Sequence, residues 1–378
     1  MTHKTLIIHN IISPYKTELF NSIYNIHPDI LVLYISPTEK RRDWKINTSD
    51  LLFPYEVMYD APCDQVKPYN LFVKTYRSLS RINPDILVID GYSYSSSWAG
   101  LLWAKLNGKK TILWSSSNAC DHERVFYKEW IKKLYATKFD AANVYGSNSR
   151  DYLLSLGVNR GVISIVGNNT DNDFYYKETQ LLLNQREELC HQYKVPRNNF
   201  LFIGRFSAEK NLFNLIEAYQ SIDEKKRSEW GLILLGDGPL REDIDQYIEE
   251  HKLSNIILPG FIQKQDIPKF MAISDVLVLP SISEPWGLVI NEAMAAGIPC
   301  IVSNKCGCYP DLVKDGINGF SFDPYDVSEL TAIMNDIVYK RVDLRTLSQN
   351  ALSIMTQYTP DNAAKIIVET VNQVMETV

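Results

Sequence analysis

Two glutamates eight positions apart frame the segment "EPWGLVINEAMAAG", which begins at Glu284. A Trp286-Gly287 turn follows the first glutamate, and the apolar spacing after it predicts a helix that carries Glu292 about two turns in. The start of such a helix leaves backbone amides free near Gly287 and Leu288, and free amides attract phosphate oxygens. The carboxylates can accept hydrogen bonds from hydroxyl groups, those of a ribose at Glu292 and those of a second sugar at Glu284. Alternatively, Glu284 only caps the helix and Glu292 is a solvated surface residue.

Two cations follow an earlier strand end in "FLFIGRFSAEKN", where Gly204 closes the strand and Arg205 and Lys210 precede a helix. Arginine binds oxygens as a planar fork and lysine as a compact charge, so this pair suits a diphosphate. Taken alone, both side chains could equally be solvated surface cations. Gly236 lies at a second glycine-rich strand end, "LLGDGPLRE", which is not the G-x-G-x-x-G fingerprint and could be a plain tight turn.

These loops need a scaffold of parallel strands, and the chain alternates short apolar runs with longer amphipathic stretches. The predicted strands are 4–9, 30–35, 86–90, 111–114, 142–146 and 162–167, followed by 200–204, 231–236, 255–260, 275–280, 299–303 and 319–322. Runs that are apolar on both faces indicate parallel strands covered by helices on both sides. The prediction is an α/β protein with two Rossmann-like, doubly wound domains, whose ligands bind beyond the carboxyl ends of the strands.

A length of 378 residues favours two hydrophobic cores. We expect a first domain over 1–175, a second over 176–358, and a terminal helix over 359–378 that packs back on the first domain. The polar stretch "NNTDNDFYYKETQ" (168–180) is the predicted linker.

The net charge of -6 and the pI near 5.6 give no general attraction to nucleic acid, so no nucleic-acid partner is expected. Six scattered cysteines and the absence of a leader or an apolar run of about 18 residues favour a cytoplasmic protein with reduced thiols. No metal is expected, because Cys306 and Cys308 form only a C-x-C pair and "DND" (171–173) and "DID" (243–245) lack the arrangement of a metal site.

The second half, from about Asn199 to Pro324, resembles the donor-binding domain of retaining GT-B glycosyltransferases of the large GT4-type family, the glycosyl transferases of group 1. The resemblance rests on "GRFSAEKN", "GDGPL", "PGFI", "EPWGLVINEAMAAG" and "DLVKDGINGFSF", in this order. It implies a GT-B fold in which two Rossmann-like domains face a central cleft. The first half is similar only in pattern, as expected of an acceptor-binding domain.

The resemblance also implies roles for individual residues. Arg205 and Lys210 would bind the diphosphate, Ile262 of "PGFI" would contact the base through its backbone, Glu292 would hold the ribose, and Glu284 would hold the donor sugar. Gly287 and Leu288 would offer amides to the distal phosphate, beside Gly204 and Gly236. Trp286 stands where phenylalanine is common; we expect it to keep an apolar wall and to direct its N–H at a ligand.

The acceptor side departs from the family pattern. Many relatives carry a histidine after an acceptor-domain strand, whereas this chain has "ILWSSSNACDHER" (112–124). The weak candidates for this side are Ser13, Tyr15, Ser116, Asn118, His122 and Arg124. The first loop, "HNIISPYK" (9–16), lacks the glycine pair that some relatives place near the phosphates, and we expect it to shape the acceptor site.

The segment "FYKEWIKKLYATKF" (126–139) interleaves lysines with Phe126, Trp130, Ile131, Leu134 and Tyr135. It could rest on an anionic membrane at the inner face, where a lipid-linked acceptor lies. The alternative is a helix packed on the sheet with a solvated basic rim.

The resulting hypothesis is a metal-independent, retaining glycosyltransferase. It would move a sugar from a nucleotide-diphosphate sugar to a glycan or lipid-linked acceptor in cell-surface polysaccharide or glycolipid synthesis. A nucleotide-sugar epimerase or hydrolase of the same architecture and a non-catalytic nucleotide-sugar binding protein stay open as alternatives. The sequence does not specify the base, the sugar, the acceptor, the linkage or the oligomeric state.

Overall fold

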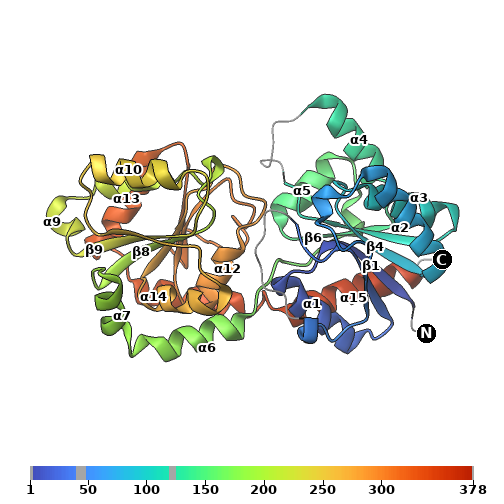
Figure 1. Cartoon of the computed structure of the whole chain (residues 1–378), viewed down its shortest axis with the longest axis horizontal. Helices are drawn as coiled ribbons and strands as arrows, with labels where there is room; N and C mark the ends of the chain where they lie inside the picture. The colour runs from blue at the N-terminus through green and yellow to red at the C-terminus, as the bar shows by residue number, and fades with distance from the viewer. Residues whose placement is uncertain (1–2, 40–47, 119–124, 377–378) are drawn as a thin grey trace. The chain divides into compact units, whose positions relative to one another are not determined.

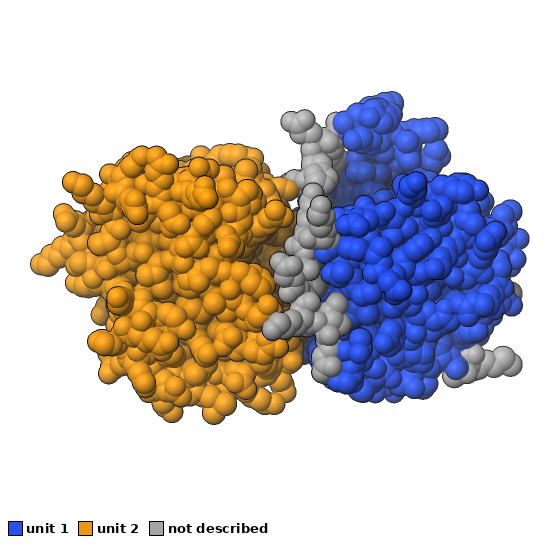
Figure 2. All heavy atoms as spheres, in the orientation of Figure 1, with its two compact units in different colours: residues 1–169, 359–378 blue, residues 170–358 orange. Residues whose placement is uncertain are grey.

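Two compact units make up the chain in a computed structural model that describes residues 3–39, 48–118 and 125–376. The first unit comprises residues 1–169 and 359–378, and the second comprises residues 170–358, as the two colours of Figure 2 show. The chain therefore leaves the first unit after Asn169 and re-enters it at Thr359.

Seven parallel strands form the sheet of the first unit, in the order β3-β2-β1-β4-β5-β6-β7. They are β1 (Thr5–Ile11), β2 (Ile30–Ser36), β3 (Tyr55–Val57), β4 (Ile86–Asp90), β5 (Lys110–Ser115), β6 (Ala141–Val144) and β7 (Ile163–Ile165). The order reverses between β1 and β4, which makes the gap between their carboxyl ends the topological switch point. The edge strand β3 is missing from the predicted strands because three residues carry too little alternation to recognise.

Helices cover both faces of this sheet. They are α1 (Pro14–Ile26), α2 (Pro68–Ile82), α3 (Ser95–Leu106), α4 (Phe126–Ala136), α5 (Ser147–Ser155) and α15 (Pro360–Glu376). The terminal helix α15 packs on α1 and on β5, β6 and β7, whereas α2 packs on α3, which contacts β1, β4 and β5 (Figure 1). Ile8 of β1 faces α3, since a Cβ added at Gly100 of that helix would lie 2.9 Å from Ile8 Cδ1. Because side chains alternate along a strand, the next residue, His9, faces the α1 side of the sheet.

The second unit repeats the architecture with six parallel strands, in the order β10-β9-β8-β11-β12-β13. They are β8 (Asn198–Ile203), β9 (Trp230–Leu235), β10 (Ile256–Gly260), β11 (Val276–Leu279), β12 (Cys300–Ser303) and β13 (Gly319–Phe322). The helices are α6 (Asn172–Leu183), α7 (Arg186–Tyr193), α8 (Leu212–Gln220), α9 (Glu224–Arg227), α10 (Arg241–Glu250), α11 (Ile267–Ala272), α12 (Leu288–Ala295), α13 (Val327–Val338) and α14 (Leu344–Met355). Both sheets confirm the predicted α/β class with doubly wound parallel sheets.

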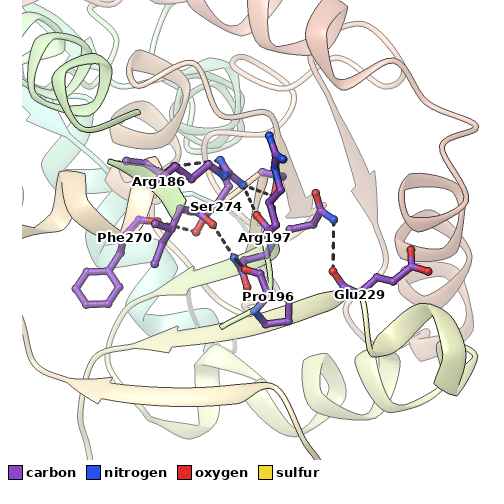
Figure 3. A network of polar contacts seen from close by, with 11 residues as sticks. Arg186, Pro196, Arg197, Glu229, Phe270 and Ser274 are labelled. Carbon is purple, nitrogen blue, oxygen red and sulfur yellow. Dashed lines mark hydrogen bonds and ion pairs between the residues drawn. The ribbon is translucent and has the colours of Figure 1, made fainter. Parts of the chain in front are cut away.

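A polar network ties α7 to the amino ends of β8 and β11 (Figure 3). Arg186 Nη2 lies 2.7 Å from Asp275 Oδ2, and the backbone amide of Asn199 donates to the same oxygen at 2.8 Å. The Asn199 side-chain amide donates to the carbonyls of Pro196 and Ile273, each at 2.7 Å. Burial raises the pKa of Asp275, while Arg186 acts in the opposite direction. These contacts lie at the amino ends of the strands, opposite to the carboxyl ends, so they stabilise the sheet.

The segment predicted as a linker is mostly helix α6. Asp171 caps this helix by accepting a hydrogen bond from the Phe174 amide at 3.0 Å, and α6 packs on α11 and α12 of the second unit. Asn172 donates to the carbonyls of Met355 and Tyr358 at 2.9 and 3.2 Å, next to the place where the chain leaves this unit again. The boundary between the two units, after Asn169, falls inside the predicted linker 168–180. Most of that segment is nevertheless helix α6 of the second unit, because its polar composition conceals an amphipathic helix that buries only Tyr175 and Thr179.

No helix in the described part of the chain has the length and apolarity needed to cross a membrane.

Candidate functional site

Two strand ends of the second unit approach each other so closely that only glycine fits. Gly236 has φ of 146°, and a Cβ there would lie 1.9 Å from the carbonyl oxygen of Gly204. A Cβ at Gly238 would lie 2.5 Å from the carbonyl oxygen of Phe206, whose own amide donates to the Asp237 carbonyl at 2.9 Å. The "GDG" loop after β9 therefore supports the backbone of the loop after β8. This explains Gly236 and Gly238 as packing requirements of the loop that carries the two cations, whereas a Cβ at Gly204 would lie 2.9 Å from the Phe202 ring.

The loops after β8 and β11 bring a cation and a carboxylate together. Lys210 Nζ forms an ion pair with Glu284 Oε2, and both side chains are largely buried. The backbone amide of Ile282 donates to the Glu209 carbonyl at 2.9 Å, which fixes one loop against the other. Because β8 and β11 are adjacent parallel strands, their carboxyl ends necessarily place these loops side by side.

Arg205 differs from Lys210 in its surroundings. Its side chain is exposed, and no ion pair to it occurs within residues 3–39, 48–118 and 125–376. Burial raises the pKa of Glu209, but the Ser207 hydroxyl, Lys210 and Arg205 outweigh this effect and leave that pKa below its ordinary value. Both cations thus act on the same carboxylate, which places them in one region of positive potential.

The helix predicted after Gly287 is α12. The residue that precedes this helix has a backbone conformation and close neighbours that only glycine tolerates. Gly287 has φ of 96°, and a Cβ there would lie 2.8 Å from Leu279 Cδ2 and 3.4 Å from Glu284 Cγ. Leu288 is the first helical residue, so its amide belongs to the first turn, where no preceding carbonyl is available within the helix. Glu284, Gly287 and Leu288 therefore meet at one point, beside Lys210.

Trp286 does not direct its N–H toward a ligand, and that expectation was wrong. The indole is buried, and its Nε1 donates to Asn291 Oδ1 at 2.8 Å. The Trp286 carbonyl accepts from the Cys308 amide at 3.0 Å, and the Glu284 carbonyl accepts from the Gly307 amide at 2.8 Å. These backbone contacts place Cys308 in the loop next to Glu284 and Trp286. Burial raises the pKa of the Cys308 thiol well above its ordinary value, so this thiol is a packing group.

Glu292 lies on α12 next to two residues that the sequence analysis missed. Burial raises the pKa of the Glu292 carboxyl to about 7, against the opposing effects of a hydrogen bond from Tyr175 and the charge of Lys264. Tyr175 comes from α6 and is 1% exposed. Lys264 Nζ lies 4.9 Å from the Phe174 ring centroid and 3.8 Å from Asp171 Oδ2. The helical pattern of 172–183 was the available signal, but the linker interpretation concealed it.

Ile262 follows β10, the edge strand, and is half-buried. It lines a cavity of about 330 Å³ together with Gln192, Tyr193, Ile257, Leu258, Pro259 and Phe270. Neither Lys210 nor Glu292 lines this cavity, which flanks the sheet edge. The structure therefore places Ile262 at the border of the site and does not join it to the ion pair.

The acceptor-side candidates fall in the first unit. Ser13 and Tyr15 lie at the start of α1, and Ser116 and Asn118 follow β5. Ser116 accepts a hydrogen bond from Ser149 at its carbonyl, at 3.3 Å, and Asn118 is buried. His122 and Arg124 lie outside the described residues.

A polar group that the sequence analysis did not single out stands at the carboxyl ends of β1 and β4. His9 Nδ1 lies 2.7 Å from Asp90 Oδ2, across the topological switch point. Lys16 of α1 is buried next to them, with its Nζ 4.4 Å from the Trp114 ring centroid and 4.6 Å from that of Tyr145. The available signal was positional, because His9 and Asp90 stand at the ends of two predicted strands.

No cluster of three or more histidine, cysteine, aspartate or glutamate side chains suited to a metal ion is found among the residues whose structure is described.

Comparison with known proteins links this geometry to a family. Residues 185–353 match the family described as glycosyl transferases group 1. A protein in the cps region of Klebsiella pneumoniae is 26% identical over 288 residues, which cover 70% of this chain and 76% of that protein. The UDP-Gal:alpha-D-GlcNAc-diphosphoundecaprenol alpha-1,3-galactosyltransferase of Escherichia coli is 33% identical over 170 residues, covering 43% of this chain and 40% of that enzyme. This chain thus spans less than half of that relative.

The fold recurs in solved structures along nearly the whole chain. The Anabaena protein HepE, crystallised with UDP, superposes with a TM-score of 0.79 at 21% identity, covering 98% of this chain and all of that one. The glycosyltransferase WaaG, involved in lipopolysaccharide biosynthesis, gives a TM-score of 0.69 at 16% identity, covering 96% of this chain and 99% of that one. At these identities the likeness concerns the fold.

Proposed function

We propose that this chain, whose residues 185–353 match the glycosyl transferases of group 1, is a GT-B glycosyltransferase that transfers a sugar from a nucleotide-diphosphate sugar to a glycan or lipid-linked acceptor. We further propose that transfer retains the anomeric configuration, needs no metal ion and serves cell-surface polysaccharide or glycolipid synthesis. The observation that carries the donor assignment is the buried ion pair between Lys210 and Glu284, beside the start of α12.

The contacts of the ion pair suggest how a donor would enter. The carboxylate of Glu284 neutralises Lys210, so this largely buried cation is paired. A donor diphosphate would compete for Lys210 and add the exposed Arg205 and the amides of Gly287 and Leu288. Glu284 would then be released to accept hydrogen bonds from sugar hydroxyls, while Glu292 accepts those of the ribose.

The same groups account for catalysis without a metal. As the bond between the anomeric carbon and the diphosphate oxygen breaks, negative charge grows on the leaving group. Fixed cations and amides aimed at that oxygen stabilise the transition state more than the ground state. The acceptor oxygen forms the new bond to the anomeric carbon, and its proton passes to the departing diphosphate.

Relatives support the choice of substrates. The E. coli relative is named for a UDP-galactose donor and a diphosphoundecaprenol-linked acceptor, and HepE structures contain UDP or UDP-glucose. The first test is therefore a thermal-shift comparison of UDP, GDP, ADP and their sugars. We expect one nucleotide to raise the melting temperature of the wild-type chain and to lose most of that shift in Glu292→Gln. No shift with any nucleotide would contradict the donor assignment.

Turnover separates the transferase from its rivals. The donor that binds is incubated with and without a panel of glycan and lipid-diphosphate acceptors, in buffer containing EDTA. We expect nucleoside diphosphate to be released only when an acceptor is present, and we expect this release to continue in EDTA. An altered or freed sugar without acceptor would indicate an epimerase or hydrolase, and an intact donor after long incubation would indicate a binding protein.

Helix α4 supports the proposal that the acceptor lies at a membrane. The alternative in which its apolar residues pack on the sheet is wrong for most of them, since Phe126 is 87% and Trp130 56% exposed and Ile131 and Leu134 are also exposed. Only the end of the helix is buried, at Tyr135 and Ala136. Burying such side chains at a lipid interface is favourable, whereas leaving them in water is not.

Charge and neighbouring surface favour an anionic bilayer. Lys128, Lys133 and Lys138 are exposed on or just after α4, whereas Lys132 is held by Glu129 at 2.8 Å. Trp98 of α3 contacts Tyr135 with ring centroids 4.5 Å apart, and Leu102 one turn further along α3 is exposed too. The exposed apolar surface therefore extends from α4 onto α3.

Liposome sedimentation tests this surface. Wild-type protein should sediment with phosphatidylglycerol vesicles, less with phosphatidylcholine vesicles, and at least about tenfold less after Phe126→Ser combined with Trp130→Ser, from the lost apolar burial. Leu181→Ser, at an exposed leucine of the second unit, is the matched control and should not change sedimentation. Equal sedimentation of all three proteins would refute the membrane assignment.

A further inference from the structure

The first unit contains a buried lysine whose charge lacks an adequate partner. Lys16 is 2% exposed, and its Nζ lies over the rings of Trp114, Tyr145 and Tyr15 at 4.4, 4.6 and 5.9 Å. No hydrogen bond or ion pair to this Nζ occurs in the described portion of the molecule. Burial lowers the pKa of Lys16 to about 7, with Asp90 acting in the opposite direction. An ammonium kept in such a place needs an anion to stabilise it.

The nearest carboxylate is already engaged. Asp90 Oδ2 lies 2.7 Å from His9 Nδ1, and Asp90 acts on Lys16 only as a more distant charge. The other groups packed around Lys16 are the rings of Trp114, Tyr145 and Tyr15, none of which carries a negative charge at neutral pH. The cluster can therefore accept a further anion.

The start of α1 adds hydrogen-bond donors at the same place. Ser13 is the N-cap residue and is fully buried, yet its hydroxyl caps no amide and has no hydrogen-bond partner among the described residues. The first turn of this 13-residue helix contains no acidic residue, and Lys16 belongs to that turn. Pro14 has no N–H and the Lys16 amide donates to the Ser13 carbonyl at 3.0 Å, so the donors at this helix start are the Ser13 hydroxyl and the Lys16 ammonium, two groups that can bind phosphate oxygens.

We propose that the Ser13 hydroxyl and the Lys16 ammonium bind a phosphate or diphosphate group carried by the acceptor. This inference rests on the proposed function, because it assumes that the bound phosphate belongs to the acceptor of the transfer reaction. The ring of Tyr135 connects this place to the apolar surface, because the Tyr135 hydroxyl donates to the carbonyl of Gly91, next to Asp90, at 3.1 Å.

The test measures binding of inorganic pyrophosphate by calorimetry at pH 6.5. Since the second unit offers its own cations, the comparison is made in full-length Lys210→Ala protein. Adding Lys16→Met should weaken pyrophosphate binding at least tenfold. Adding Lys74→Met, which removes another lysine placed 4.2 Å from a tyrosine ring in the same unit, should leave it unchanged. Equal affinity with and without Lys16→Met would overturn the proposal.

Three further experiments keep the outcome interpretable. If Lys16→Met does not fold, Ser13→Ala replaces it, with an expected loss of threefold or more. UDP affinity should be the same for wild-type and Lys16→Met proteins, because the donor groups lie in the second unit; a wild-type chain that binds no nucleotide would count against the donor assignment alone. Farnesyl diphosphate identifies the source of the phosphate. Tighter binding than pyrophosphate, lost in Trp130→Ser, indicates a lipid-linked group, and equal binding indicates a soluble one.

Discussion

Replacing Glu292 with glutamine should stabilise the second unit above pH 7 while it weakens nucleotide binding. Burial raises the pKa of Glu292 from its ordinary 4.5 to about 7. Each tenfold change in proton affinity corresponds to about 1.4 kcal/mol, so the ionised carboxylate costs the folded state about 3 kcal/mol. Glutamine keeps the shape and an oxygen for the hydrogen bond from Tyr175 but carries no charge.

The pH dependence follows from the direction of this pKa change. Between pH 4.5 and 7 the folded chain binds more protons at Glu292 than the unfolded chain does. The stability that protonation provides is therefore fully present below pH 4.5 and is lost as the pH rises through 7. The advantage of Glu292→Gln should grow from near zero at pH 4.5 to about 3 kcal/mol at pH 8.

Urea unfolding at pH 5, 6, 7 and 8 measures this difference, with pulse hydrogen exchange of α12 peptides reporting the second unit alone. Glu178→Gln is the matched control, because it removes the same charge from an exposed position of α6. The same Glu292→Gln protein should bind UDP about 1 to 3 kcal/mol more weakly at pH 8, from the lost charge-assisted hydrogen bonds. A stability difference that is the same at every pH would refute the reasoning.

Four other substitutions probe separate parts of the chain. Lys210→Ala should lower kcat about 10² to 10³-fold in a nucleotide-release assay, from the lost stabilisation of the leaving group; unchanged turnover would exclude that role. Gly236→Ala should abolish folded protein in expression trials, because its Cβ would lie 1.9 Å from the Gly204 oxygen. Gly91→Ala, with φ of 59° and open space around it, should cost only about 1 to 2 kcal/mol, and equal losses would contradict the packing argument. Lys16→Met should raise stability at pH 6 by up to about 4 kcal/mol and progressively less toward pH 10, since the pKa of Lys16 is lowered to about 7; urea unfolding with no such pH trend would contradict a buried ammonium.

The donor loops could be predicted because each is local in sequence. Gly204 and the two cations follow one strand, and Gly287 starts the helix after another, so a strand-to-helix pattern was enough to locate them. The carboxyl ends of parallel strands lie at the same end of the sheet. Lys210 and Glu284 therefore meet although 74 residues separate them. Their chemical roles remain predictions.

Contacts between distant helices and strands could not be predicted in the same way. Even the short-range hydrogen bond from Trp286 to Asn291, five residues away, was missed, because it depends on the turn at Gly287 and on the burial of both side chains. Tyr175 sits in a polar stretch that looked like a linker, and its contact with Glu292 depends on how α6 packs on α12. Hydrophobic spacing likewise does not reveal that the described part of the first unit leaves the apolar face of α4 exposed.

The amino-acid sequence by itself determined the alternation of strands and helices, the glycines at strand ends and the residue types of the donor loops, because these depend on neighbours a few positions apart. Tertiary structure alone decided which side chains are buried together, as with Lys16 under Trp114 and Tyr145 and His9 beside Asp90. Burial and pairing are properties of elements brought together from distant parts of the chain, and they set the charge states on which the chemistry depends.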